Sequence, residues 1–119
     1  MTTLAEIMEF QRKFDDAHGW RWSAEPNKKM DKLKDGTICL AGEVGEFANV
    51  LKKIVRHSER SMPDGELWAS LRDELTDVFI YLIKLADLLE VELDKSYFEK
   101  MSTNARRFEG FRCQNKQVG

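Results

Sequence analysis

Apolar residues recur every three or four positions in four stretches of the chain, which is the spacing of one helix face. The predicted helices are residues 3–17, 37–57, 66–89 and 94–108. Only 7 Gly and 2 Pro stand in the whole chain, so few turns are available, and long helices are favoured over many short strands. The pattern predicts an all-α fold, a four-helix bundle-like chain.

The connections between these helices differ in character. Residues 19–36 read as irregular, and Trp20 and Trp22 fall in this polar stretch. Pro63, Asp64 and Gly65 signal a turn before the third helix. Thr3 with an acidic residue three positions later fits a capping box at the start of the first helix.

The second half of the third helix, VFIYLIKLADLL, is apolar nearly all round. A helix of this kind is buried on more than one side, and a four-helix chain offers little to cover it. A second copy of the chain is the simplest cover, so we expect a homo-oligomer, a dimer or a tetramer. The longest apolar run, residues 78–83, is far short of the roughly 20 residues of a membrane span, so no membrane partner is expected.

The chain length of 119 residues suits one domain, predicted over residues 1–110, with 111–119 as a disordered tail. A net charge of −2 offers no basic surface for nucleic acid. Cys39 and Cys113 form no CxxC motif and read as two reduced thiols. The N-terminal residues carry no basic segment typical of a signal peptide. We therefore expect a soluble, cytoplasmic protein.

Two pairs of carboxylates interrupt apolar stripes. Glu43 and Glu46 are three residues apart on the second predicted helix, and Glu74 and Asp77 repeat this spacing on the third. Residues three apart lie on one face of a helix. Packed together, the two helices would bring four carboxylates into a small volume, which costs several kcal/mol unless cations neutralise them.

Two remedies for this repulsion remain open from the spacing alone: a network of salt bridges to Lys or Arg, or a divalent metal ion. A set of oxygen ligands favours hard cations, so Mg²⁺ fits best and Mn²⁺ is a possible substitute. Zinc is disfavoured because no His or Cys joins the set.

The segments GEVGE (42–46) and DELTDVFIYLIKLAD (73–87) together resemble the MazG-like, all-α nucleoside triphosphate pyrophosphohydrolase superfamily, whose signature is ExxE, a spacer and ExxD. The resemblance spans about residues 38–108. It implies Mg²⁺-dependent hydrolysis of a nucleoside triphosphate to the monophosphate and pyrophosphate, which cleanses the nucleotide pool. It also implies that Glu43, Glu46, Glu74 and Asp77 are the metal ligands, and that Glu46 activates the water.

The same resemblance implies contacts to the nucleotide from several further residues. The sequence KMSTNARRFEG matches a family pattern for phosphate contacts, although Phe108 and Glu109 depart from the Tyr and Pro expected there. The substrate-binding candidates are Asn49, Lys53, Tyr81, Lys100, Asn104, Arg107, Trp20 and Trp22. The two Trp residues are candidates from their own chemistry, as flat stacking partners for the base, and covering the end of the bundle is the open alternative. For Tyr81 the open alternative is a core tyrosine with its hydroxyl hydrogen-bonded.

Two other functions stay open at this point. One is a non-catalytic helical dimer, an adaptor or regulator whose acids are neutralised by Lys and Arg. The other is a related phosphoanhydride hydrolase that acts on a different nucleotide.

Overall fold

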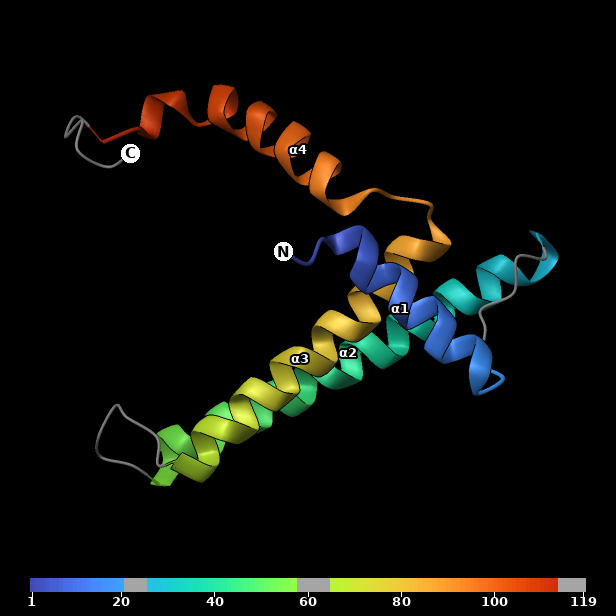
Figure 1. The fold of residues 1–119 in the computed structure, drawn as a ribbon. Coiled ribbons are helices and arrows are strands. Elements are labelled where there is room, and N and C mark those ends of the chain that lie inside the picture. Colours follow the sequence, from blue (N-terminus) through green and yellow to red (C-terminus); the bar gives the residue numbers. More distant parts are fainter. Residues whose placement is uncertain (21–25, 58–64, 114–119) are drawn as a thin grey trace.

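The structure is a computed structural model, and it describes residues 1–20, 26–57 and 65–113. These residues form four α-helices and a short 3₁₀ helix, without a strand (Figure 1). The elements are α1 (Leu4–Ala17), α2 (Pro26–His57), α3 (Gly65–Leu88), α4 (Leu93–Arg107) and η1 (Glu109–Phe111). The predicted all-α fold is confirmed. The expected single domain over 1–110 and the disordered tail stay predictions, and residues 114–119 lie outside the described part.

The first helix starts and ends on local signals of the sequence. The backbone N–H of Glu6 donates to Oγ1 of the N-cap residue Thr3 at 3.2 Å. After Ala17 the chain turns through Gly19, whose φ of 68° lies in the left-handed region that favours glycine. This confirms the predicted bounds of the first helix within one residue.

The prediction of an irregular segment is wrong for residues 26–36, because α2 begins at Pro26. Proline suits the first position of a helix, where its missing N–H is not needed. The residues after it include many Lys and Asp side chains that lie comfortably on a solvated helix face. Thr37 was expected to open the helix, but its Oγ1 donates back to the Leu33 carbonyl at 2.7 Å, within the helix. Gly36 is buried inside α2 rather than forming a turn.

The helices α2 and α3 run antiparallel and side by side (Figure 1). The helix α1 crosses the pair near the C-terminal end of α3 and packs against α3 (Figure 1). The buried apolar residues are few among the described residues: Ile54, Ile83, Ala86 and Leu88. Two ion pairs help to fix α1 on α3. Arg12 forms one with Asp87, and Lys84 forms the other with Asp15 at 3.4 Å.

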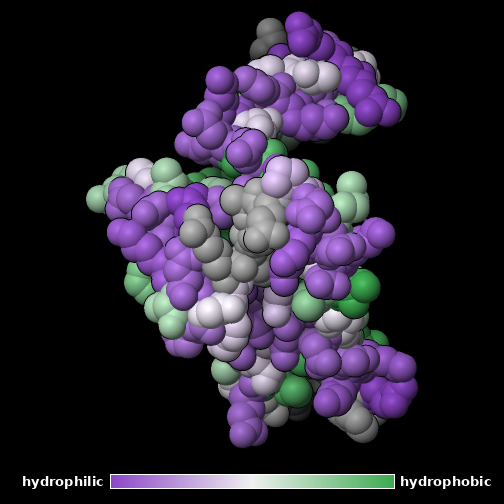
Figure 2. Space-filling model, turned by 90° about the vertical axis from the view of Figure 1, so that its right-hand side faces the viewer, coloured by the Kyte–Doolittle hydropathy of each residue, from purple (hydrophilic) through white to green (hydrophobic). Residues whose placement is uncertain are grey.

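The helix α4 stands apart from the other three (Figure 1). Figure 2 shows it as a separate mass above the rest of the molecule, with hydrophobic residues on its surface. It has no buried residue, and its apolar face is open to solvent at Tyr97, Phe98, Met101 and Phe108. The radius of gyration is 18.5 Å, against about 13–14 Å for a compact domain of this length. One copy of the chain therefore leaves α4 without a packing surface.

Among the described residues, no helix has the length and apolar character needed to cross a membrane.

Candidate metal site

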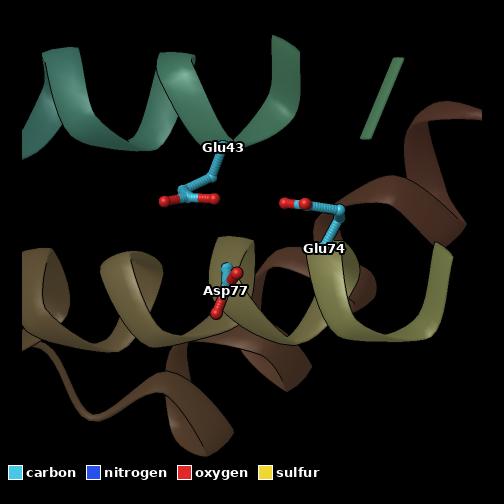
Figure 3. A group of neighbouring side chains, drawn as sticks. All are labelled: Glu43, Glu74 and Asp77. Carbon is cyan, nitrogen blue, oxygen red and sulfur yellow. The ribbon is translucent and has the colours of Figure 1, made fainter. Parts of the chain in front are cut away.

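Three of the four predicted carboxylates meet between α2 and α3. Glu43 comes from α2, and Glu74 and Asp77 come from α3. One oxygen of each lies within 4.8 Å of the others, and all three residues are half-buried. Figure 3 shows Glu43 and Glu74 extending into the space between the two helices, with Asp77 one turn further along α3. We refer to these three residues as the acidic triad.

Helix register places the triad. Glu74 and Asp77 are three residues apart, so both project from the face of α3 that meets α2. Glu43 stands on the matching face of α2, because the two helices pack antiparallel along their length (Figure 1). The carboxylates therefore follow from the same amphipathic pattern that packs the helices.

Burial and repulsion among the acids both act on Glu74. Its pKa is raised above the ordinary value, first by burial and then by the charges of Asp77, Glu43, Glu46 and Asp73. No Lys or Arg in residues 1–20, 26–57 or 65–113 forms an ion pair with the triad. Among these residues, therefore, no salt bridge supplies the neutralisation that the sequence left open. The three converging oxygen ligands are compatible with a hard divalent ion.

Glu46 occupies a different position from the other three acids. It is exposed and stands outside the triad, although its charge contributes to the raised pKa of Glu74. It therefore lies at the edge of the group, on the same helix as Glu43. The structure brings together three of the four expected ligands and leaves the fourth open to solvent.

Tyr81 lies one turn beyond Asp77 on α3 and is half-buried. The pKa of its hydroxyl is raised by burial, by the neighbouring Cys39, and by the charges of Glu43 and Asp77. Its position one helical turn after Asp77 puts Tyr81 in the layer next to the triad. Asn49 and Lys53, which follow Glu46 on α2, are both exposed.

The candidates on α4 are not brought to the triad within one chain. Lys100, Asn104 and Arg107 stand on the helix that lies apart from α2 and α3 (Figure 1). Asn104 Nδ2 is 3.8 Å from the Met101 sulfur, and the Arg107 guanidinium lies 5.0 Å from the centre of the Phe108 ring. These local contacts leave the polar groups of α4 on an open surface.

The two tryptophan candidates have different outcomes. Trp20 follows the end of α1, where its ring stacks on His18 at 4.9 Å between centroids and remains 57% exposed. Its exposed face leaves room for a further ring. Trp22 lies outside the described residues.

Sequence reasoning missed three residues near the site: Cys39, Asp15 and Lys84. Cys39 precedes Glu43 by four residues, so helical spacing alone puts it on the face of the triad. Asp15 and Lys84 form a buried ion pair between helices, and the two residues are distant in sequence. Helical spacing could have indicated Cys39, but no local pattern indicates the Asp15–Lys84 pair.

Comparisons with known proteins found both relatives in sequence and a solved structure of similar fold. No family model matches the chain. The mouse protein named dCTP pyrophosphatase 1 is 32% identical over 108 residues, and the human protein of that name is 30% identical over 111 residues. The chain is a relative of these proteins. Each match covers 89% of this chain, and the chain spans 59% of the length of the curated relatives.

These relatives confirm the resemblance carried by GEVGE and DELTDVFIYLIKLAD. The fold has its own counterpart in the crystal structure of a pyrophosphatase from Archaeoglobus fulgidus, with a TM-score of 0.66 and 22% identity. That match covers 91% of this chain and 94% of the other. The helical arrangement is therefore shared over nearly all of both chains.

Proposed function

We propose that the protein is a Mg²⁺-dependent nucleoside triphosphate pyrophosphohydrolase, which converts a (d)NTP into the (d)NMP and pyrophosphate. The observation that carries this proposal is the acidic triad of Glu43, Glu74 and Asp77, three converging carboxylates without a Lys or Arg partner among the described residues. The relatives named dCTP pyrophosphatase 1 support it independently.

In this proposal the triad holds the cation, and Glu46 joins it as a fourth ligand from the edge. Mg²⁺ suits an all-oxygen site completed by water and phosphate oxygens, and Mn²⁺ would substitute. When bound, such an ion neutralises charge on the triphosphate and polarises the reacting phosphoryl group. The carboxylates that repel one another without a cation would thereby form the binding site of the ion.

The attacking group is water, and we assign its activation to Glu46. Glu46 is the one exposed member of the four acids, so it has access to solvent beside the triad. Its carboxylate accepts the proton as the water oxygen bonds to phosphorus. The bridging bond between the α- and β-phosphates breaks, and pyrophosphate leaves with the bonding electrons.

The nucleotide is proposed to contact residues from three helices and the loop after α1. Tyr81 faces the nucleoside, and the remaining contacts to phosphate or base come from Asn49, Lys53, Lys100, Asn104, Arg107, Trp20 and Trp22. The three residues of α4 are remote from the triad in one chain, so the proposal includes a homodimer or tetramer in which α4 packs on another copy. The exposed apolar face of α4 supports this assembly.

The proposed role is to cleanse the nucleotide pool of the cytoplasm. The names of the relatives make dCTP the first substrate to test. The other bases and the ribonucleotides complete the set.

The experiment is a screen of the common NTPs and dNTPs with Mg²⁺, in which pyrophosphate and monophosphate are detected together. We expect equal amounts of the two products. Release of orthophosphate would mark a different phosphoanhydride hydrolase. If the protein binds neither Mg²⁺ nor a non-hydrolysable dNTP at millimolar metal, the non-catalytic adaptor becomes the favoured function.

A further inference from the structure

Tyr81 lies against Lys84 of its own helix, and a chain of contacts links Lys84 to α1. On one side the Lys84 ammonium lies 5.2 Å from the centre of the Tyr81 ring, in a cation–π contact along α3. That ammonium is itself fixed by Asp15 of α1, at 3.4 Å. The side chains of Lys84 and Asp15 are only 13% and 7% exposed, so this pair is largely removed from solvent.

Asp15 is fixed in turn by its own helix. Gln11 Nε2 donates to Asp15 Oδ1 at 3.0 Å, from one turn earlier on α1. The carboxylate therefore has two partners, and the chain of contacts runs from Gln11 through Asp15 and Lys84 to the ring of Tyr81. A ring held this way has lost much of its freedom before any ligand arrives.

Cys39 of α2 shares the layer of Tyr81 by helix register. Cys39 precedes Glu43 by four residues, and Tyr81 follows Asp77 by four residues. Because α2 and α3 run antiparallel (Figure 1), one turn back on α2 and one turn forward on α3 lead in the same direction. The register therefore places Cys39 and Tyr81 in the same layer, and Cys39 contributes to the raised pKa of the phenol. Cys39 nevertheless remains exposed, so this layer opens to solvent.

The Cys39–Tyr81 layer therefore lies one helical turn, about 5 Å, from the acidic triad. A triphosphate bound at the triad places its nucleoside within reach of a neighbouring layer. A phenol there offers an apolar ring and a hydroxyl, which suit the carbon skeleton and oxygens of a pentose.

We propose that Cys39, through a hydrogen bond to the Tyr81 hydroxyl, and Lys84, through its contact with the Tyr81 ring, are positioning residues that hold Tyr81 beside the acidic triad. In this proposal both govern nucleotide affinity through Tyr81. This inference rests on the proposed function and adds to it two residues outside the metal and phosphate contacts. Neither residue touches the reacting phosphoryl group, so both act on binding rather than on the chemical step.

The kinetic test is a double-mutant cycle. Cys39→Ala is expected to raise KM about fivefold with kcat unchanged, the effect of losing one ordinary hydrogen bond. Tyr81→Phe is expected to do the same, and the double variant should be no worse than Tyr81→Phe alone. Cys39→Ser keeps a hydrogen-bonding group and should restore most of the affinity, whereas Cys113→Ala, at the other exposed thiol, should change nothing. If the increases in KM from Cys39→Ala and Tyr81→Phe multiply in the double variant, the two residues act independently and the coupling is overturned. A fall in kcat without a change in KM would also overturn it.

Lys84 is tested by the same measurement with two variants. Lys84→Arg keeps the cation for both Asp15 and the ring, and it should retain the KM of the parent protein. Lys84→Met should raise KM about as much as Tyr81→Phe, measured at a temperature where its helical content matches the parent. An unchanged KM in folded Lys84→Met would remove Lys84 from the proposal.

Thiol labelling tests the contact without any turnover. Iodoacetamide reacts with both exposed cysteines, and mass spectrometry separates Cys39 from Cys113. Loss of the hydrogen bond in Tyr81→Phe should speed the alkylation of Cys39 about threefold relative to Cys113, on the scale of one weak hydrogen bond. Equal relative rates in the two proteins would overturn the Cys39–Tyr81 contact. If no nucleotide is hydrolysed, the proposed function fails, while this labelling still decides whether Cys39 holds Tyr81.

Discussion

The α2–α3 pair and α4 are built from similar amphipathic sequences but have opposite environments. The pair runs side by side and brings Glu43, Glu74 and Asp77 together from two helices. The helix α4 carries its own apolar face, yet none of its residues is buried. One region has found its packing partner within the chain, and the other has not.

This difference separates what one chain can do from what an assembly can do. The acidic triad needs only α2 and α3, so a single chain holds the candidate metal site. The phosphate contacts proposed for α4 need that helix to be brought to the site, and its apolar face supplies a reason for it to pack on another copy. We therefore expect variants in the two regions to fail in different ways.

The largest effect is expected in the packed region, at the triad. Asp77→Asn should lower kcat/KM by about a thousandfold or more, because a neutral amide replaces an anionic metal ligand. Circular dichroism should show unchanged helical content. Glu66→Gln, an exposed acid at the start of α3, is the matched control and should retain activity. Full activity of Asp77→Asn would remove the metal site.

Lys84→Met tests how much the packing of α1 on α3 contributes to stability. The change leaves Asp15, only 5% exposed, without its cation, and should lower the free energy of unfolding by about 3 kcal/mol. Urea unfolding followed by circular dichroism measures this. Lys13→Met removes the cation of a solvated pair with Glu9 and should cost about 0.5 kcal/mol or less. Equal losses in the two variants would contradict the buried role of Lys84.

Phe98→Asp tests whether α4 packs on a second copy. The Phe98 side chain is 69% exposed in one chain, so the change should leave the folded monomer intact. It should weaken self-association about fiftyfold, since an apolar contact is replaced by a charge. Sedimentation velocity over a concentration series measures the association. Thr103→Asp places the same charge on the opposite face of α4, and similar weakening there would contradict the assigned interface.

Lys100→Ala should have a smaller effect, on substrate binding alone. Loss of one charged contact to phosphate is expected to raise KM about tenfold, with little change in kcat. Lys95→Ala, which removes a charge from the first turn of α4, should leave KM unchanged. If neither variant alters KM, α4 serves assembly and not the substrate.

The smallest effect is a shift in the titration of Glu74. Its raised pKa means that the folded state binds the proton more tightly than the unfolded state does, so metal-free stability falls as pH rises through the window between the two pKa values. Glu43→Gln removes one repelling charge and should lower the pKa of Glu74, as should added Mg²⁺. Carboxylate NMR measures both shifts. Glu92→Gln is the control and should leave the pKa of Glu74 unchanged. An unchanged Glu74 pKa in Glu43→Gln would show that the two carboxylates do not interact.

The helices could be predicted because their apolar spacing is local information. The predicted ends of three of the four helices agree with the structure within one residue. The predicted start of α2 was wrong, because Asp35 and Gly36 suggested a turn there. Gly36 instead lies buried in α2, because tertiary packing favours a helix there and the local sequence does not indicate it. The position of α4 could not be predicted, because an amphipathic face does not say which surface will cover it.

The clustering of the candidate residues was predicted to a similar extent, while their role stays a prediction. The i, i+3 spacing indicated that Glu43, Glu74 and Asp77 would meet, because register on two packed helices decides which side chains come together. Glu46 shares the motif but lies at the exposed edge, a distinction that depends on helix rotation. The contact of Lys84 with Asp15 joins residues far apart in sequence, so no local pattern indicates it.

The most direct test of the metal site is calorimetric titration of the protein with Mn²⁺, which substitutes for Mg²⁺. We expect saturable binding in the parent protein and in Glu66→Gln, and its loss in Glu43→Gln and Asp77→Asn, which remove ligands from different helices. Unaltered Mn²⁺ binding in both triad variants would contradict the account.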